Sequence, residues 1–478
     1  MTGLIARLAE HARQRPHHAA VVAPAGSLDY RTLLARVEAG AAFLSAQGLG
    51  ADSVVGLTID DELEHLVATL ALLRLGTRQI VLATHDAEPL RARIAARVGV
   101  TCRLLGSRDA GTAAGTAVLR WPGADLPPAP APQGTPAGGR LYLKTSGTTG
   151  DMNIVAFDEA QLAAQAERHA DYRDERLLRV ASIEHNNSKR HRLYCVWAGG
   201  SNVFRPESGE LVDFALRERV SCLDISRMHA ADLAATPGAE RLAGLKLRTG
   251  GSAVPQGVRR AVLERVTPAL YVRYAATECG AIAMALPGEH DADEVAGRPL
   301  PGVELEVVDA EDRPQPPGCG GAIRLRAPGM AEGYLDNPQQ TAQRFRDGWF
   351  YPGDMGLLRS DGRLVVLGRQ DDMIVLNGLN IFPAEIERVL EAHPGVAEAA
   401  AFPWPSVVHG QIPVAAVVLR PGADVGSAEL QRHAREHLGL RAPRRVLMLE
   451  QLPRNPQGKT MKTALAAMLP AAAERSTA

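Results

Sequence analysis

Apolar residues recur with two different spacings along the first 120 positions of the chain. Apolar positions three and four apart predict amphipathic helices, whereas short continuous apolar runs predict buried strands. Helical spacing marks the N-terminal segment before Pro16 and the segments Thr32–Leu44 and Glu64–Leu75, and strand-like runs lie at Ser53–Leu57 and Gln79–Leu82. Because strands alternate with helices, this part favours an α/β fold with a substantially parallel sheet.

The pattern changes twice in the middle of the chain. Residues Pro122–Gly139 are rich in Pro, Gly and Ala and have no periodicity, which indicates an exposed connection. A strand-like run at Leu141–Leu143 follows, and strands and helices then alternate again to about residue 300. Between Gly302 and Leu325 apolar residues alternate around Pro and Gly turns, which predicts antiparallel strands.

The last part of the chain has the pattern of a separate small unit. Asp361-Gly362 predicts a turn before a short strand, and a helix is expected from about Pro383, because proline is favourable at the first position of a helix. The predicted fold class is therefore α/β. A large N-terminal domain, residues 1–370, would combine α/β sheets with a small β subdomain, and residues 371–478 would form a small α+β domain.

Composition restricts the class of protein. The chain has 478 residues, of which 46% are apolar and 22% are charged, so it can bury real cores and is not a disordered protein. Its formal net charge of -1 gives no overall attraction to nucleic acid or to an anionic membrane. We therefore expect small-molecule partners, no nucleic acid and no membrane insertion.

The N-terminus and the cysteines favour a cytoplasmic protein. Glu10 interrupts the apolar residues of the first segment, so no signal peptide is predicted, and no run reaches the ~18 apolar residues of a membrane helix. The five cysteines are scattered without metal-binding spacing, which fits a reducing compartment. We expect a cytoplasmic monomer or homodimer. The cysteines are Cys102, Cys195, Cys222, Cys279 and Cys319.

A loop of small and hydroxyl residues follows the strand at Leu141–Leu143. Residues 145–150 read Thr-Ser-Gly-Thr-Thr-Gly. Glycines let such a loop turn its backbone N–H groups toward an anion, and hydroxyls add donors without bulk. The loop is not a Walker motif, and a simple polar turn is the alternative interpretation.

This loop resembles the signature of the adenylate-forming superfamily, which includes acyl-CoA synthetases and peptide-synthetase adenylation domains. Four further segments resemble family motifs in the same order. They are Leu247–Ala253 (LRTGGSA), Tyr274–Glu278 (YAATE), Gly333–Asp354 with its continuation through Gly368–Asp372 (GRQDD) to Asn377–Glu387, and Leu452–Lys459 (LPRNPQGK). The matches span residues 140 to 465, and the N-terminal third matches in pattern only.

The resemblance implies roles for residues of these motifs. Tyr274 would stack on adenine, Thr277 would contact the α-phosphate, and Glu278, with Thr145, would hold Mg²⁺, for which hard oxygen ligands are suitable. Asp354 and Arg369 would reach the ribose or phosphate. Family members commonly have Gly in place of Ala275. The implied ATP-binding residues are Thr145, Ser146, Gly147, Thr148, Thr149, Gly150, Gly251, Ser252, Ala253, Tyr274, Ala275, Asp354 and Arg369.

Further implied roles concern catalysis and the acyl group. Lys459 would be the catalytic lysine, acting with Glu278 and Thr277, because positive charge stabilises the charge that builds up on the reacting phosphate. Asp371 would be the hinge about which a mobile C-terminal domain rotates. The residues assigned to the acyl group are His185, Asn186, Gly250, Ala276 and Gly280.

The chain departs from the family pattern directly after the loop. Family members usually have a small residue and then Pro-Lys, whereas this chain has Asp151, Met152 and Asn153. The lysine that would neutralise the outer phosphates is absent. Either another cation takes its place, or catalysis is weakened, or the variation has no compensation.

The densest basic cluster in the chain is a candidate for that substitution. It runs from His185 to Arg192, and Lys189, Arg190 or Arg192 could face phosphates, CoA or a polar acyl group. The alternative interpretation is a solvated turn of helix.

The resemblance implies an ATP-dependent carboxylic acid ligase that forms an acyl-adenylate and transfers the acyl group to a thiol. The motifs resemble those of free-standing acyl- and aryl-CoA ligases, so the implied cofactors are ATP, Mg²⁺ and CoA. A ligase that loads the phosphopantetheine of a separate carrier protein is one alternative. A non-catalytic relative that binds nucleotide or acyl groups is the other, because the loop lysine is absent.

The nature of the carboxylic acid is left open by the sequence. Small residues at Gly250–Ala253 and Ala275–Ala283 leave room for a ring or a medium chain, whereas the basic cluster favours a polar acid. An amino-acid substrate would call for an aspartate near position 184 in this family. The chain has Glu184 there, beside His185, and this does not decide the matter.

Overall fold

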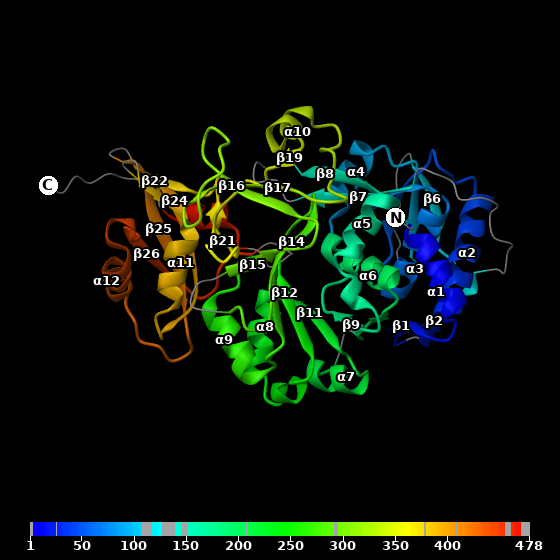
Figure 1. The fold of residues 1–478 in the computed structure, drawn as a ribbon, viewed down its shortest axis with the longest axis horizontal. Coiled ribbons are helices and arrows are strands. Elements are labelled where there is room, and N and C mark those ends of the chain that lie inside the picture. The colour runs from blue at the N-terminus through cyan, green and yellow to red at the C-terminus, as the bar shows by residue number, and fades with distance from the viewer. Residues whose placement is uncertain are drawn as a thin grey trace.

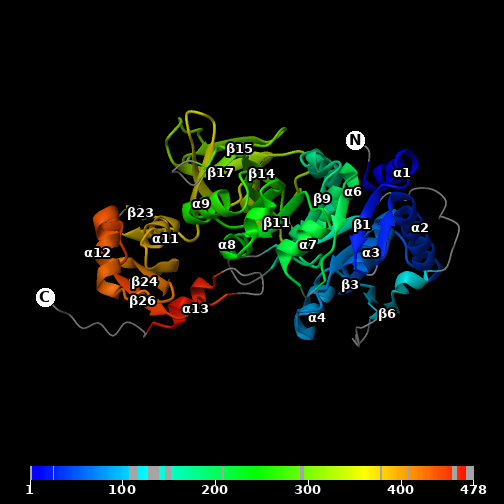
Figure 2. The ribbon, with the colours of Figure 1, turned by 90° about the horizontal axis from the view of Figure 1, so that it is seen from below.

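The computed structural model describes residues 3–24, 26–106, 116–126, 139–145, 152–206, 209–290, 295–376, 379–406, 409–454 and 460–469. Two sheets and a C-terminal lobe follow one another along the long axis of the molecule (Figures 1 and 2). In Figure 1 the N-terminal part is blue and cyan, the central part green and the C-terminal lobe orange.

The first sheet has six strands in the order β6-β5-β3-β4-β7-β8, and only the last pair is antiparallel. This arrangement confirms the predicted α/β alternation and its parallel sheet. The strands are β3 (Val54–Thr58), β4 (Arg78–Val81), β5 (Cys102–Leu105), β6 (Ala117–Arg120), β7 (Arg140–Thr145) and β8 (Asn153–Asp158), and the helices of this part are α1 (Leu4–Gln14), α2 (Tyr30–Ala46), α3 (Glu62–Arg74) and α4 (Glu88–Arg97).

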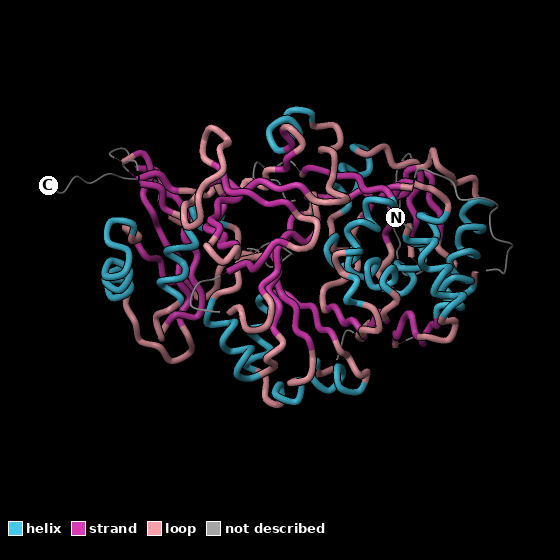
Figure 3. The backbone as a smooth tube through the Cα atoms, viewed as in Figure 1, coloured by secondary structure: helices cyan, strands magenta, loops and turns pink. Residues whose placement is uncertain are grey.

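The second sheet begins with parallel strands in the order β1-β10-β9-β11-β12-β13, with β2 antiparallel at its edge. Helices α7, α8 and α9 cover one face and share an apolar core with it, while α5 and α6 cover the other (Figure 3). The bounds are β1 (Ala19–Ala23), β2 (Gly26–Asp29), β9 (Arg176–Arg179), β10 (Ser201–Val203), β11 (Cys222–Ser226), β12 (Lys246–Gly250), β13 (Leu270–Ala276), α5 (Glu159–Glu167), α6 (Asn186–Ala198), α7 (Leu211–Arg217), α8 (Arg227–Ala235) and α9 (Gln256–Arg265).

Helices α3, α5 and α6 form a layer between the two sheets. One apolar cluster joins Leu66 of α3, Leu162 of α5 and Leu193 of α6 to Leu141 of the first sheet and Leu177 of the second. A helix in this layer is covered on both sides, so its polar side chains need buried partners.

Antiparallel strands extend the second sheet, and the predicted small β subdomain is a continuation of it rather than a separate sheet. The predicted strands between Gly302 and Leu325 are β16 and β17, which pair antiparallel as expected. The extension contains β14 (Gly280–Ala285), β15 (Val295–Pro299), β16 (Glu304–Val308), β17 (Gly321–Arg326), β18 (Phe345–Arg346), β19 (Trp349–Phe350), β20 (Asp354–Leu358), β21 (Leu364–Arg369) and the helix α10 (Pro338–Arg344).

The C-terminal lobe has its own sheet and its own apolar core. Ile386 and Leu390 of α11 pack there with Ile374, Val417 and Leu430. The predicted boundary at residues 370 and 371 falls between the end of β21 and the start of β22. The elements are β22 (Ile374–Leu376), β23 (Leu379–Ile381), β24 (Val396–Ser406), β25 (Gly410–Leu419), β26 (Arg445–Leu449), α11 (Pro383–Glu391), α12 (Ser427–Leu438) and α13 (Lys462–Ala467).

Two sequence predictions concern the remaining segments. Within the predicted connection Pro122–Gly139 the structure describes a short 3₁₀ helix, Gly123–Asp125, and residues 127–138 lie outside the described residues. Among the described helices, none combines the length and the apolar character needed to span a bilayer.

Candidate active site

A polar cluster joins the predicted adenine and ribose residues. Tyr274 lies near the end of β13, Asp354 begins β20 and Arg369 ends β21. Strands β20 and β21 pair with each other, whereas β15 and β14 lie between β21 and β13 in the same sheet. The Tyr274 hydroxyl donates to Asp354, and the Arg369 guanidinium lies 3.1 Å from the other carboxylate oxygen. Burial and the neighbouring Asp354 carboxylate raise the pKa of Tyr274 well above its ordinary value, so the hydroxyl keeps its proton and remains a donor.

The turn between β13 and β14 carries Thr277 and Glu278. Glu278 is buried, and one of its carboxylate oxygens accepts a hydrogen bond of 2.8 Å from the Tyr334 hydroxyl. The backbone N–H of Ala331 donates to the Glu278 carbonyl at 2.7 Å. The segment around Tyr334 therefore fixes this carboxylate, and a carboxylate with a second oxygen left for a cation suits Mg²⁺.

Arg190 of α6 supports the same turn from inside the molecule. Its guanidinium donates to the Thr277 carbonyl at 2.8 Å and to the Gln165 side chain at 3.3 Å. Arg190 thus positions the turn between β13 and β14 through the backbone carbonyl of Thr277.

The predicted glycine turn lies at the end of β12. A Cβ atom on Gly250 would come within 2.4 Å of the Arg273 carbonyl, so only glycine fits there, and Gly251 has a positive φ of 86°. Gly251, Ser252 and Ala253 are exposed, whereas Gly280 is buried at the start of β14. Ala275 and Ala276, the last residues of β13, are half-buried.

Most of the phosphate loop lies outside the described residues, which leave out Ser146 to Asp151. Its first residue, Thr145, and the residues that flank this gap are described. Thr145 is buried at the end of β7. Lys144 forms an ion pair of 2.9 Å with Asp86, and its carbonyl accepts a hydrogen bond from Asn186. The predicted acyl residue Asn186 therefore lies beside Lys144, which directly precedes the loop.

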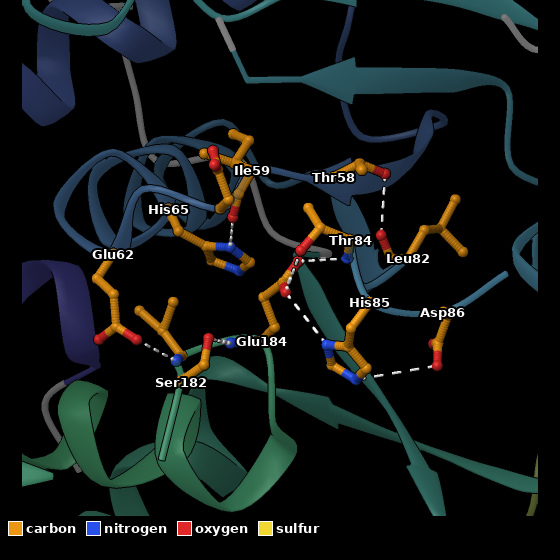
Figure 4. A network of polar contacts seen from close by, with 12 residues as sticks. Thr58, Ile59, Glu62, His65, Leu82, Thr84, His85, Asp86, Ser182 and Glu184 are labelled. Carbon is orange, nitrogen blue, oxygen red and sulfur yellow. Dashed lines mark hydrogen bonds and ion pairs between the residues drawn. The ribbon is translucent and has the colours of Figure 1, made fainter. Parts of the chain in front are cut away.

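A buried polar network lies next to this contact (Figure 4). The Glu184 carboxylate accepts hydrogen bonds from the backbone and the hydroxyl of Thr84, at 2.8 and 2.7 Å, and lies 3.5 Å from His85. The rings of His85 and His185 are 5.1 Å apart. Burial, followed by the nearby His85 and Lys144, lowers the pKa of His185, so this ring is neutral at pH 7.

Asn153, which stands where family members have the loop lysine, makes a structural contact. The Asn153 side chain accepts a hydrogen bond of 2.8 Å from Asn337, and the Ile154 carbonyl accepts one of 2.7 Å from the N–H of Leu335. Asn153 therefore ties β8 to the segment before α10. On the other side, the Arg97 guanidinium of α4 donates to the carbonyl of Met152, the first described residue after the loop.

The expectations for the basic cluster His185–Arg192 are corrected by the structure. The cluster is not a solvated turn, because Lys189, Arg190 and Arg192 are almost fully buried within α6. Arg192 pairs with Glu62 at 2.8 Å and Arg190 holds the Thr277 carbonyl, so neither is available to phosphates or CoA. The physical reason is the place of α6 in the middle layer, where both sides of the helix are covered.

The remaining predicted residues belong to the C-terminal part. Lys459 lies outside the described residues. Asp371, the predicted hinge, forms ion pairs of 3.1 Å with Arg344 and 3.3 Å with Arg369. A pocket of about 450 Å³ lies between Met228 of α8 and a wall made by the C-terminal lobe, which includes Leu452, Pro453 and Arg454.

Cys279, which directly follows Glu278, is not placed to act as a nucleophile. It is fully buried, and burial raises the pKa of its thiol to about 12.

Sequence reasoning missed three contributors to this site. Tyr334 lies within the motif Gly333–Asp354, and its aromatic hydroxyl was a signal that could have identified it. Its acidic partner, Glu278, lies in another motif. Arg97 and the Thr84–His85 segment carry no such signal, because only the folded chain brings α4 and the end of β4 to the loop.

Comparison with known proteins identifies the family. A family model described as AMP-binding enzyme matches residues 8–335, and one described as AMP-binding enzyme C-terminal domain matches residues 385–459. The chain is 36% identical over 224 residues to the 2-succinylbenzoate–CoA ligase of Geobacillus kaustophilus, a stretch that covers 46% of this chain and 45% of that relative. The chain thus matches less than half the length of this relative.

Two solved structures match nearly the whole chain. ATP-bound MatB from Rhodopseudomonas palustris is 26% identical with a TM-score of 0.88, and the match covers 98% of both chains. The amide bond synthetase McbA from Marinactinospora thermotolerans is 25% identical with a TM-score of 0.87, covering 97% of this chain and 98% of that one. With its large N-terminal and small C-terminal domains, the chain belongs to the AMP-binding, adenylate-forming enzyme superfamily.

Proposed function

We propose that this protein is an ATP-dependent acid–thiol ligase that joins a small carboxylic acid to CoA. The observation that carries the proposal is the convergence of Tyr274, Thr277 and Glu278 at the end of β13 with Asp354 of β20 and Arg369 of β21. Together these side chains would bind the base, the ribose and the reacting phosphate of ATP.

The first half-reaction forms an acyl-adenylate. A carboxylate oxygen of the substrate bonds to the α-phosphorus of ATP, and the bond to the bridging oxygen breaks, so that pyrophosphate leaves with the electron pair. Thr277 would contact the α-phosphate, and Glu278 with Thr145 would hold Mg²⁺, which neutralises phosphate charge. Lys459 would stabilise the charge that builds up between carboxylate and phosphate.

The second half-reaction transfers the acyl group to a thiol. The thiolate attacks the acyl carbon, and AMP leaves with the electrons of the acyl–oxygen bond. No protein nucleophile is required in either step, which agrees with the high pKa of the Cys279 thiol. Catalysis then rests on positioning and electrostatic stabilisation.

Between the two steps we propose that residues 371–478 rotate about Asp371 relative to residues 1–370. The ion pairs of Asp371 with Arg344 and Arg369 support this role, because they join the first residues after β21 to the ribose cluster. Rotation would withdraw Lys459 after adenylation and open the adenylate to the thiol.

CoA is the proposed acceptor because the named relative is a CoA ligase and the motifs resemble those of free-standing acyl-CoA ligases. The full-length likeness to McbA favours one second candidate, in which an amine takes the place of the thiol. A carrier-protein phosphopantetheine presents the same reactive arm as CoA and is the third acceptor to test.

The experiment that tests the proposal is product analysis after incubation with ATP, Mg²⁺, a mixed panel of carboxylic acids and one acceptor at a time. Acyl-CoA as the dominant product is the expected result. An amide formed with a supplied amine, with no thioester from CoA, would assign the protein to the second candidate. A product only with a phosphopantetheinylated carrier would assign it to the third.

The proposal includes a cytoplasmic location and a monomeric or homodimeric state. All five cysteines are free thiols, which fits a reducing compartment.

A further inference from the structure

A layer of buried charged side chains lies on the sheet next to Gly250, one of the predicted acyl-binding residues. The layer consists of Arg179, Asp224, Arg248 and Arg273. Strand pairing places Asp224 of β11 beside Arg179 of β9 and Arg248 of β12, and places Gly250 beside Arg273 of β13. Neighbours in register on parallel strands share a face of the sheet. This layer and Gly250 therefore lie on the same face, one step apart along the strands.

This face is the one that α6 covers. The residue directly before each of Asp224, Arg248 and Arg273 packs into the core with α8 and α9. These residues are Leu223, Leu247 and Val272. Because successive side chains on a strand point to opposite faces, Asp224, Arg248 and Arg273 point to the α6 side. All three are nearly inaccessible to solvent.

Arg273 reaches from β13 past β12 to Asp224 on β11. Its guanidinium lies 3.1 Å from the Asp224 carboxylate, although the strand β12 separates β13 from β11. A Cβ atom on Gly250 would lie 2.4 Å from the carbonyl oxygen and 3.3 Å from the Cβ of Arg273, so the absent side chain of Gly250 lets Arg273 approach closely. The space predicted for an acyl ring or medium chain therefore has a charged floor on this face of the sheet.

The layer holds more positive than negative charge. The Asp224 carboxylate is shared by Arg179 and Arg273, and Arg248 pairs only with Asp171, whose side chain is 49% exposed. Among the described residues, the Arg248 Nε and Nη1 atoms and the Arg179 Nε atom are buried without a hydrogen-bond partner. Unpaired buried donors on charged groups are costly, so this arrangement favours an anionic ligand.

The neighbouring histidine rings do not change the net charge of this layer. His169 and His191 lie close to these arginines, and burial lowers the pKa of each ring well below its ordinary value, so both are neutral. Tyr172 stacks under Arg248, with the guanidinium 4.5 Å from the ring centroid, and its hydroxyl lies 2.8 Å from His191 Nδ1.

We propose that the carboxylic acid activated by this protein is short and carries a second anionic group, a carboxylate or a sulfonate, which Arg273 and Arg248 bind at the floor of the acyl site. The proposal rests on the proposed function, since it names the substrate class of the same site. Arginine is suited to the task because its guanidinium binds a carboxylate or sulfonate with two hydrogen bonds.

The test compares acids that differ only in the second group. Acid-dependent exchange of pyrophosphate into ATP is measured with succinate, 3-sulfopropionate and butyrate, and binding of the same acids is measured by calorimetry without ATP. We expect kcat/KM and affinity for one or both dianions to exceed those for butyrate by at least about tenfold. A preference for the sulfonate over the carboxylate, or the reverse, identifies the second group.

Two variants make the assignment specific. Arg273→Met leaves Asp224 paired with Arg179, so the fold should be kept, and we expect it to remove the preference for the dianions. Arg273→Lys should restore part of it. The control Arg324→Met removes a more exposed pair outside the proposed site, in which Arg324 lies 2.6 Å from Glu306 on β16, and should leave the preference unchanged.

Two results would overturn the inference. Exchange with butyrate equal to or better than exchange with both dianions would refute the anion-binding floor and leave the ligase function standing. If no acid supported exchange, the ligase function would fail, and calorimetry would still decide: preferential binding of a dianion supports the inference, and its absence refutes it.

Discussion

Single side chains in this site act mostly by holding other groups in place. Glu278 is the clearest case, since its carboxylate is fixed by the Tyr334 hydroxyl and its backbone by Ala331. The Asp354 carboxylate is likewise fixed by Tyr274 and Arg369. Preorganised carboxylates of this kind can bind a cation or a ribose without first changing conformation.

Replacing Tyr334 with Phe tests that role. A hydrogen bond to a charged group contributes about 1.5–3 kcal/mol, so we expect adenylation to fall by roughly tenfold to a hundredfold. The concentration of Mg²⁺ required for half-maximal rate should rise, which a general loss of packing would not cause. An unchanged Mg²⁺ requirement would argue against a positioning role for Tyr334.

Arg97 is a cation that contacts Met152, the first described residue after the phosphate loop. It donates to the Met152 carbonyl and has no carboxylate partner among the described residues. We expect Arg97→Ala to raise the KM for ATP by about tenfold, because a charge-assisted contact to phosphate would be lost. Arg93→Ala, on the exposed side of the same helix, is the matched control. Equal effects of both variants would exclude a specific role.

At the level of elements, α6 explains what could and could not be predicted from the sequence. Periodicity located α2, α3 and the strands β3 and β4, because these elements bury apolar residues with regular spacing. It made no prediction for α6, whose Lys-Arg-His-Arg run was interpreted either as a group that faces a ligand or as a solvated turn, and neither interpretation anticipates its burial. The partners that make its burial possible, such as Glu62 for Arg192 and the Thr277 carbonyl for Arg190, are distant in sequence.

The site shows the same division. Motif residues such as Tyr274, Asp354 and Arg369 could be named from the sequence, and the fold brings these three together. The charged floor could not be named, because Asp224 and Arg273 become neighbours only through the strand order β11-β12-β13.

Lys189 in α6 gives a pH-dependent prediction. It is fully buried, and burial lowers its pKa to about 7, with Glu184 acting weakly in the opposite direction. Between pH 7 and the ordinary lysine pKa of ~10.4, the unfolded chain binds more protons than the folded one, so stability should rise with pH. We expect Lys189→Met to be more stable than the native protein at pH 7, with a difference that shrinks towards pH 9.

Urea unfolding at pH 7, 8 and 9 measures this difference. A gap between the two proteins that is the same at all three values would show that Lys189 does not titrate in this range.

At the scale of the whole molecule, the proposed function divides the reaction between the two domains. The large domain carries the nucleotide cluster, and the small domain carries Lys459. We therefore expect Lys459→Ala to lose acyl-adenylate formation by several orders of magnitude, while thioester formation from supplied acyl-adenylate and CoA continues at a similar rate. Rapid-quench measurement of each half-reaction separates the two, and equal loss of both would refute the division.

Activation of a carboxylic acid with ATP is the proposed activity from which the other proposals follow, and acid-dependent exchange of labelled pyrophosphate into ATP measures it. We expect exchange that requires Mg²⁺ and a carboxylic acid and that disappears in Lys459→Ala. Nucleotide binding without exchange, across a panel of monocarboxylic and anionic acids, would contradict this proposal and show the protein to be a binding relative.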